Sequence, residues 1–145
     1  MDAALDARWM ARAIQLAGRG HYSTSPNPNV GCVLVRDNEL LAEGWHQRAG
    51  EGHAEVNALA RCEQTQGATA YVSLEPCSHH GKTPPCAEAL IKAGIKRVVV
   101  AMEDPNPEVS GRGVQLLRDA GIHVEVGLQQ SQAEALNPGF IKRMK

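Results

Sequence analysis

The chain has 145 residues, 43% hydrophobic and 21% charged, with 15 Lys and Arg against 16 Asp and Glu. A chain of this size suits one compact domain with a hydrophobic core. The near-zero net charge and the few aromatic residues, two Trp, two Tyr and one Phe, argue against a basic or base-stacking surface for nucleic acid. No apolar run approaches the roughly 18 residues that span a membrane. We therefore expect no nucleic acid and no membrane as partners.

The N-terminal segment has the pattern of an amphipathic helix. Apolar residues recur at helical spacing over residues 6–18, with acids and arginines between them. This composition is unlike that of a secretory signal peptide, so we expect a cytoplasmic protein. In that compartment the four cysteines are more typical of thiols or metal ligands than of disulfides.

The other elements follow in an order that predicts the fold class. We expect, in chain order, a strand 30–35, a turn 36–39, a strand 40–46, a helix 53–62, a strand 68–74, a helix 86–94, a strand 97–102, a helix 114–121, a strand 123–128 and a last helix or linker 131–145. A helix and a hairpin followed by alternating strands and helices indicate an α/β protein. We predict a three-layer α/β/α sandwich with a mixed, mostly parallel central sheet.

Three residues have the pattern of a metal site. His53 lies at the start of a predicted helix, and Cys77 and Cys86 lie at the two ends of one polar loop. One imidazole and two thiolates suit a catalytic zinc ion, which takes three protein ligands and keeps a fourth position for water. Each helix that carries a ligand follows a strand, so we expect both helices to begin at the same edge of the sheet. A helix N-terminus also lowers the pKa of a cysteine.

Glu55 distinguishes a catalytic site from a structural one. It lies two residues after His53, where it could reach the site without being a ligand. A hydrolytic site uses such a carboxylate as a general base and then as a general acid. The pattern H-x-E followed by P-C is typical of zinc nucleobase deaminases. The chain departs from their short cysteine pair, because eight residues separate Cys77 from Cys86.

Longer motifs connect the chain to a known family. The stretches "NPNVGCVLV", "GWHQRAGEGHAEVNAL", "LEPCSHHGKTPPCAEAL", "AGIKRVVVAMEDPNPEVSGRG" and "LNPGFIKRMK" cover nearly the whole chain. They resemble the pyrimidine deaminase of riboflavin biosynthesis, the N-terminal half of a bifunctional deaminase/reductase. The resemblance implies a cytidine deaminase-like fold and one zinc-dependent deaminase domain over residues 1–145. A reductase domain is then expected in a longer natural chain, with the end "NPGFIKRMK" as the boundary.

The resemblance also implies the reaction and the residues that perform it. The reaction is hydrolytic deamination of 2,5-diamino-6-ribosylamino-4(3H)-pyrimidinone 5′-phosphate, which yields 5-amino-6-ribosylamino-2,4(1H,3H)-pyrimidinedione 5′-phosphate and ammonia. The implied metal is Zn²⁺, held by His53, Cys77 and Cys86. The implied catalytic residue is Glu55. The residues implied to bind the substrate are Asn27, His46, His79 and Lys82.

Several residues admit a plainer interpretation. Asn27 could be a turn former, and His46 a surface residue at a strand end. Asp104 and Asn106 could line the sugar edge of a pocket or simply form a turn. Cys32 and Cys62 have the positions of small, buried or partly buried apolar residues. His80, beside His79, would serve the shape of the loop or support the residues that contact the substrate.

Two other functions remain open from the sequence. Another zinc deaminase would act on cytidine, guanine or an adenosine in transfer RNA, but the short Cys-x-x-Cys expected there is absent. A zinc-stabilised binding module without turnover normally has four closed protein ligands, whereas three are found here. The sequence is compatible with a homo-oligomer and does not specify one.

Overall fold

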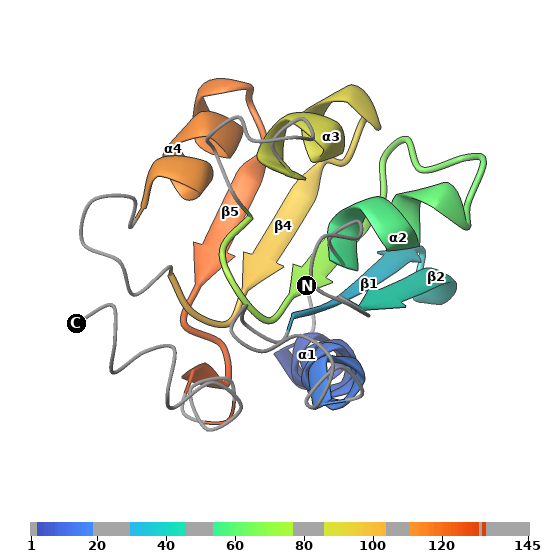
Figure 1. Cartoon of the computed structure of the whole chain (residues 1–145), viewed down its shortest axis with the longest axis vertical. Helices are drawn as coiled ribbons and strands as arrows, with labels where there is room; N and C mark the ends of the chain where they lie inside the picture. Colours follow the sequence, from blue (N-terminus) through green and yellow to red (C-terminus); the bar gives the residue numbers. More distant parts are fainter. Residues whose placement is uncertain are drawn as a thin grey trace.

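The computed structural model describes residues 3–18, 30–45, 54–76, 86–103, 111–130 and 132. The elements, in chain order, are α1 (Ala3–Gly18), β1 (Gly31–Arg36), β2 (Glu39–Trp45), α2 (Ala54–Ala60), β3 (Thr69–Val72), α3 (Cys86–Lys92), β4 (Arg97–Val100), α4 (Arg112–Asp119) and β5 (His123–Val126) (Figure 1). Each predicted helix and strand up to residue 128 is confirmed, with ends that differ by a few residues. The predicted helix or linker over 131–145 falls almost entirely outside the described residues.

The five strands form one mixed sheet in the order β2-β1-β3-β4-β5. β1 pairs antiparallel with both β2 and β3, whereas β3, β4 and β5 are parallel to one another. The β1–β2 hairpin turns at Asp37 and Asn38, whose φ angles of 52° and 61° are those of a tight hairpin turn. The predicted mixed sheet is thus confirmed, and its parallel part begins beyond the hairpin.

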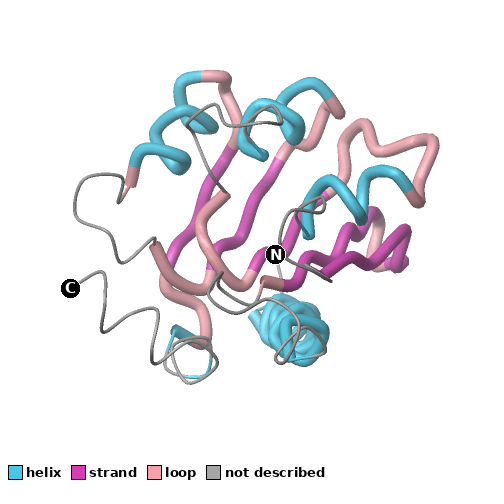
Figure 2. The backbone as a smooth tube through the Cα atoms, viewed as in Figure 1, coloured by secondary structure: helices cyan, strands magenta, loops and turns pink. Residues whose placement is uncertain are grey.

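Helices cover both faces of the sheet. Helix α1 is seen end-on below β1 in Figure 2, and α2, α3 and α4 lie on the opposite face. The α1 face buries Met10, Ala13 and Leu16 against Val33 and Val99. The other face buries a second cluster from all three remaining helices and from alternate positions of the strands. This arrangement is the predicted three-layer sandwich.

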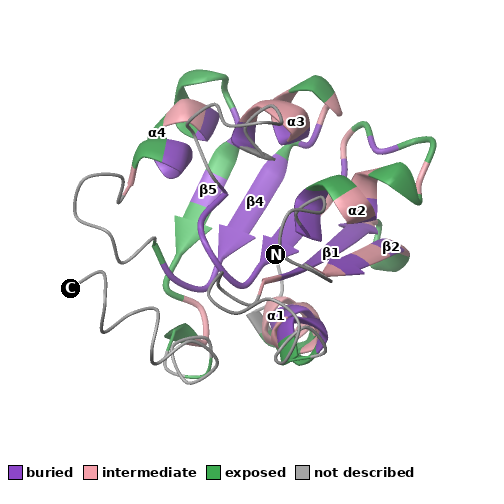
Figure 3. Cartoon of the chain, viewed as in Figure 1, coloured by how far each residue is buried: buried purple, intermediate pink, exposed green. Residues whose placement is uncertain are grey.

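Strand β4 is buried along its whole length (Figure 3). It lies between β3 and β5 in the sheet (Figure 1). Val98 and Val100 belong to the cluster on the face of α2, α3 and α4, and Val99 belongs to the cluster on the face of α1. A strand enclosed on both faces needs apolar side chains at successive positions, which explains the continuous "VVV" of residues 98–100.

Helix α2 packs directly on the backbone of β2 at Gly44. A Cβ atom at Gly44 would lie 2.5 Å from the backbone nitrogen of Ala58 and closer still to the carbonyl oxygen of Ala54. Both neighbours are backbone atoms of α2, so the helix itself would have to shift. Glycine at this position therefore sets how closely α2 approaches the sheet.

We expect Gly44→Ala to lower the free energy of unfolding by about 1–3 kcal/mol, the usual cost of overpacking a close contact. The midpoint of urea denaturation measures this effect. Gly18→Ala is the matched control, because a Cβ atom at Gly18 meets nothing within 4 Å and the residue ends helix α1. Equal midpoints for the two variants would contradict the close packing of α2.

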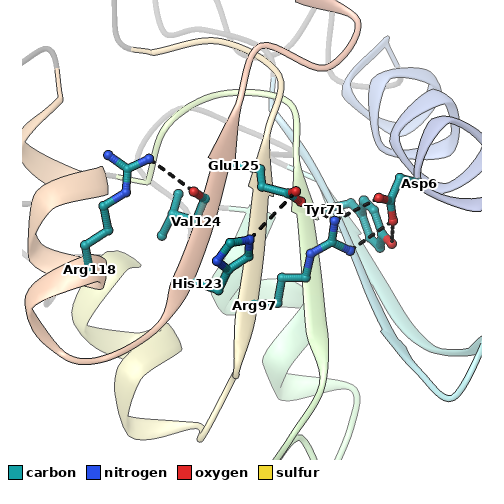
Figure 4. Close-up of polar contacts among 7 residues, drawn as sticks. All are labelled: Asp6, Tyr71, Arg97, Arg118, His123, Val124 and Glu125. Carbon is teal, nitrogen blue, oxygen red and sulfur yellow. Dashed lines mark hydrogen bonds and ion pairs between the residues drawn. The ribbon is translucent and has the colours of Figure 1, made fainter. Parts of the chain in front are cut away.

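A buried ion pair joins α1 to the sheet on the face opposite α2 (Figure 4). The guanidinium of Arg97 donates to both carboxylate oxygens of Asp6, at 2.9 and 2.8 Å, and also pairs with Glu125. The hydroxyl of Tyr71 donates to Asp6 at 2.6 Å. Burial, followed by the bond to Asp6, raises the pKa of Tyr71 and keeps its hydroxyl protonated as a donor. This network fixes the start of α1 against β3 and β4.

Candidate active site

One edge of the sheet gathers the segments that carry the predicted site. Strands β2 and β3 both run antiparallel to β1, so they point in the same direction, and β4 is parallel to β3. Their carboxyl ends therefore share one edge. Helix α2 is the next element after β2, and α3 is the next after β3. The prediction that both helices begin at the same edge is confirmed.

The structure describes two of the predicted site residues. Glu55 is the second residue of α2, and Cys86 is the first residue of α3. The other predicted positions lie outside the described residues: Asn27, His46, His53, Cys77, His79, Lys82, Asp104 and Asn106. The described residues that flank these undescribed stretches, Val30, Trp45, Ala54, Pro76 and Glu103, lie at or beside this edge.

Glu55 is buried although it is charged. Its exposed fraction is 3%, in the first turn of a helix that packs on the sheet. Burying a carboxylate is costly unless something compensates for it. Structural carboxylates are usually left at the surface, so this burial marks Glu55 as a functional candidate.

Cys32, the second residue of β1, lies in the same apolar cluster as Ala54 and Ala58 of α2. The thiol is fully buried, and burial raises its pKa well above the usual range. The negative charge of Glu55 raises the pKa of Cys32 further. Cys32 is thus a neutral, small core residue, and Cys62 is a partly buried free thiol. Both predictions for these cysteines are confirmed.

The two helices that begin at the site are packed together. Ala54, which follows His53, and Ala87, which follows Cys86, are both fully buried in the same apolar cluster. Within the described ranges no group of three His, Cys, Asp or Glu side chains could hold a metal, as two of the three predicted ligands lie outside them. By their chemistry, the imidazole of His53 and the thiolates of Cys77 and Cys86 would nevertheless make a donor set that suits zinc.

Side chains that the sequence analysis did not single out anchor the segments around the site. The hydroxyl of Ser73 accepts a hydrogen bond from the backbone nitrogen of Gly31, at 3.0 Å, and ties the end of β3 to the start of β1. The side chain of Asn57 on α2 donates to the carbonyl of Trp45, at 2.8 Å, where β2 ends. Glu75 accepts two hydrogen bonds from the start of α4. Of these three residues, only Glu75 has a recognisable signal in the sequence, because it is a charged residue directly after an apolar strand.

Comparison with known proteins agrees with this architecture. Residues 4–102 match the model of the cytidine and deoxycytidylate deaminase zinc-binding region. The fold and this match define a deaminase domain of the zinc-binding type. Among the described residues no helix has the length and apolar character that crossing a membrane requires.

Individual relatives are closely similar. The Escherichia coli riboflavin biosynthesis protein RibD is 62% identical over 97% of the chain, which spans 38% of that protein. The diaminohydroxyphosphoribosylamino-pyrimidine deaminase of Buchnera aphidicola subsp. Acyrthosiphon pisum is 55% identical, with 97% of the chain and 96% of the relative covered. A solved Thermotoga maritima diaminohydroxyphosphoribosylaminopyrimidine deaminase/5-amino-6-(5-phosphoribosylamino)uracil reductase has a TM-score of 0.93 at 44% identity, covering 97% of this chain and 41% of that one.

The chain therefore belongs to the family of diaminohydroxyphosphoribosylaminopyrimidine deaminases of riboflavin biosynthesis. The resemblance that "LEPCSHHGKTPPCAEAL" indicated is confirmed. The chain spans about two fifths of the length of its longer relatives and nearly all of the shorter one.

Proposed function

We propose that residues 1–145 form a zinc-dependent deaminase domain that hydrolyses 2,5-diamino-6-ribosylamino-4(3H)-pyrimidinone 5′-phosphate. The products are 5-amino-6-ribosylamino-2,4(1H,3H)-pyrimidinedione 5′-phosphate and ammonia. The proposal rests on one observation above all, the burial of the Glu55 carboxylate in the first turn of α2, at the sheet edge where Cys86 begins α3. The names of the closely similar relatives support the choice of substrate.

In this proposal His53, Cys77 and Cys86 hold Zn²⁺, which, when bound, supplies Lewis-acid activation of water. Glu55 takes a proton from the attacking water while the oxygen of that water bonds to the ring carbon that bears the 2-amino group. Glu55 then delivers that proton to the ring nitrogen, takes the second proton from the new hydroxyl group and passes it to the departing amine. The carbon–nitrogen bond breaks, a carbonyl forms at that carbon, and ammonia leaves.

The rest of the site would recognise the ribotide. The residues proposed to contact the substrate are Asn27, His46, His79 and Lys82. Asn57 supports this arrangement from the described part of the chain, because it holds the carbonyl of Trp45, the residue before His46. A reductase domain, as named for the Thermotoga maritima relative, would be the partner in a longer natural chain.

The direct test is ammonia release from freshly prepared diaminopyrimidinone ribotide by protein of measured zinc content, with cytidine and guanine as parallel substrates. We expect release from the ribotide alone. Release from cytidine or guanine instead would support zinc-dependent deamination but contradict the proposed substrate. No release from any of the three at full zinc occupancy would contradict deaminase activity of this domain.

A further inference from the structure

Helix α4 takes its N-terminal cap from a distant segment. The residue before the helix, Gly111, has a φ of 82° and gives no side-chain cap of its own. The carboxylate of Glu75 takes that role: Oε1 accepts from the backbone nitrogen of Gly111 and Oε2 from that of Val114, each at 3.0 Å. A carboxylate here satisfies two N–H groups that the helix leaves unpaired and faces the positive end of its dipole.

The backbone around Glu75 is held from two sides. The nitrogen of Glu75 donates to the carbonyl of Met102 at the end of β4, at 2.9 Å. The next carbonyl, that of Pro76, presses on Gly113 in the first turn of α4. A Cβ atom at Gly113 would overlap the Pro76 oxygen and lie 3.1 Å from its carbonyl carbon. Residues 75 and 76 are therefore clamped between β4 and α4.

The segment held in this way, residues 75 and 76, directly precedes a proposed metal ligand in the chain. Pro76 is fully buried, and the next residue in the chain is Cys77. Figure 3 shows the segment that follows β3 as buried up to this point. Residues that hold a metal ligand in place without touching the metal commonly matter for binding: replacing them lowers metal affinity by about 10–100-fold.

We propose that Glu75 is a positioning residue for the metal site, which sets the place of Cys77 by fastening the preceding backbone to the start of α4. The inference rests on the proposed function, since it takes Cys77 as a zinc ligand. A simple helix cap would affect the stability of α4 alone. A positioning residue also affects how firmly zinc is held and how the thiolate meets the metal.

The test compares Glu75→Gln with Glu103→Gln in the full chain. The glutamine nitrogen cannot accept a hydrogen bond, so one N–H of α4 loses its partner in the first variant. Glu103 is exposed, and its Oε2 would lie 3.1 Å from a Cβ atom at Gly111. Its replacement thus removes the same charge beside the same helix start without breaking the clamp.

Two readouts report on the metal rather than on the fold: the rate of zinc transfer to a chromophoric chelator under native conditions, and the thiolate-to-metal charge-transfer band of the cobalt-substituted protein. For Glu75→Gln we expect zinc transfer to be faster by about 10-fold or more, with a changed cobalt band. Glu103→Gln should match the parent chain in both.

A Glu75→Gln variant with a lower melting temperature but unchanged zinc transfer and cobalt band would overturn the inference and leave only a helix cap. If that variant does not fold, Glu75→Asp, which keeps the charge but shortens its reach, is judged by the same readouts. Cys77→Ser separates the two proposals. If it loses zinc while the Glu75 variant does not, only the inference fails. If it keeps zinc like the parent, the proposed ligand set and the inference fail together.

Discussion

Glu55→Gln is expected to abolish nearly all turnover while the protein stays folded and keeps its zinc. Glutamine has the shape of glutamate but cannot take up a proton at neutral pH, so both proton transfers are lost. General acid–base catalysis contributes roughly 100- to 10,000-fold, and we expect kcat to fall within that range. The measurements are ammonia release under saturating substrate and zinc content by metal analysis.

Glu88→Gln is the matched control for this prediction. Glu88 lies two residues after Cys86 in the first turn of α3, as Glu55 lies two residues after His53 in α2, but it is only partly buried and pairs with Lys92. We expect it to retain the turnover of the parent chain. Full turnover in a zinc-loaded Glu55→Gln variant would refute the catalytic role. Loss of zinc from that variant would point to Glu55 as a ligand instead.

Arg97→Met is expected to cost the largest amount of stability, about 3 kcal/mol, because it leaves Asp6 without its main partner. The Arg97 side chain is 3% exposed and that of Asp6 16%, so water can replace little of the lost interaction. Adding Asp6→Leu should recover part of the loss, since the double variant no longer leaves a poorly exposed carboxylate at position 6 without its partner. Urea denaturation of the two single variants and the double variant measures this coupling.

The exposed pair between Glu88 and Lys92, at 3.2 Å, provides the control for this prediction. Lys92→Met should change the free energy of unfolding by no more than about 0.5 kcal/mol, as is usual for such helix pairs. An equal effect of Lys92→Met and Arg97→Met would contradict a special role for the buried pair.

The same pair predicts how stability depends on pH. The hydrogen bonds from Arg97, and then the one from Tyr71, lower the pKa of Asp6 below its usual value, although burial acts in the opposite direction. The folded pKa of Asp6 is thus below the unfolded one, which is about 3.9. The contribution of Asp6 is complete above that pH and is lost as the pH falls through the folded pKa. The stability difference between the parent chain and Arg97→Met should therefore shrink below about pH 4.

The sequence alone was enough to predict the elements and the kind of chemistry. Apolar spacing over residues 6–18, the continuous "VVV" of β4 and the "RDNE" turn depend on local contacts and on backbone preferences, which are readable along the chain. The kind of chemistry followed from His53, Glu55, Cys77 and Cys86, because these residue types in this order serve few purposes besides a catalytic metal site. The family was indicated by the resemblance of longer motifs, among them "LEPCSHHGKTPPCAEAL".

The tertiary structure decided what depends on residues far apart in the chain. β3 was predicted to extend to Leu74 but ends at Val72, because Ser73 turns to bond with Gly31 and Glu75 reaches α4. The antiparallel pairing of β1 with β3 aligns β2 with β3, and this alignment brings the starts of α2 and α3 to one edge. Likewise, nothing near Arg97 in the sequence indicates Asp6 as its partner, 91 residues away. Long-range hydrogen bonds and ion pairs leave no periodic pattern in a sequence, because only the folded chain brings their partners together.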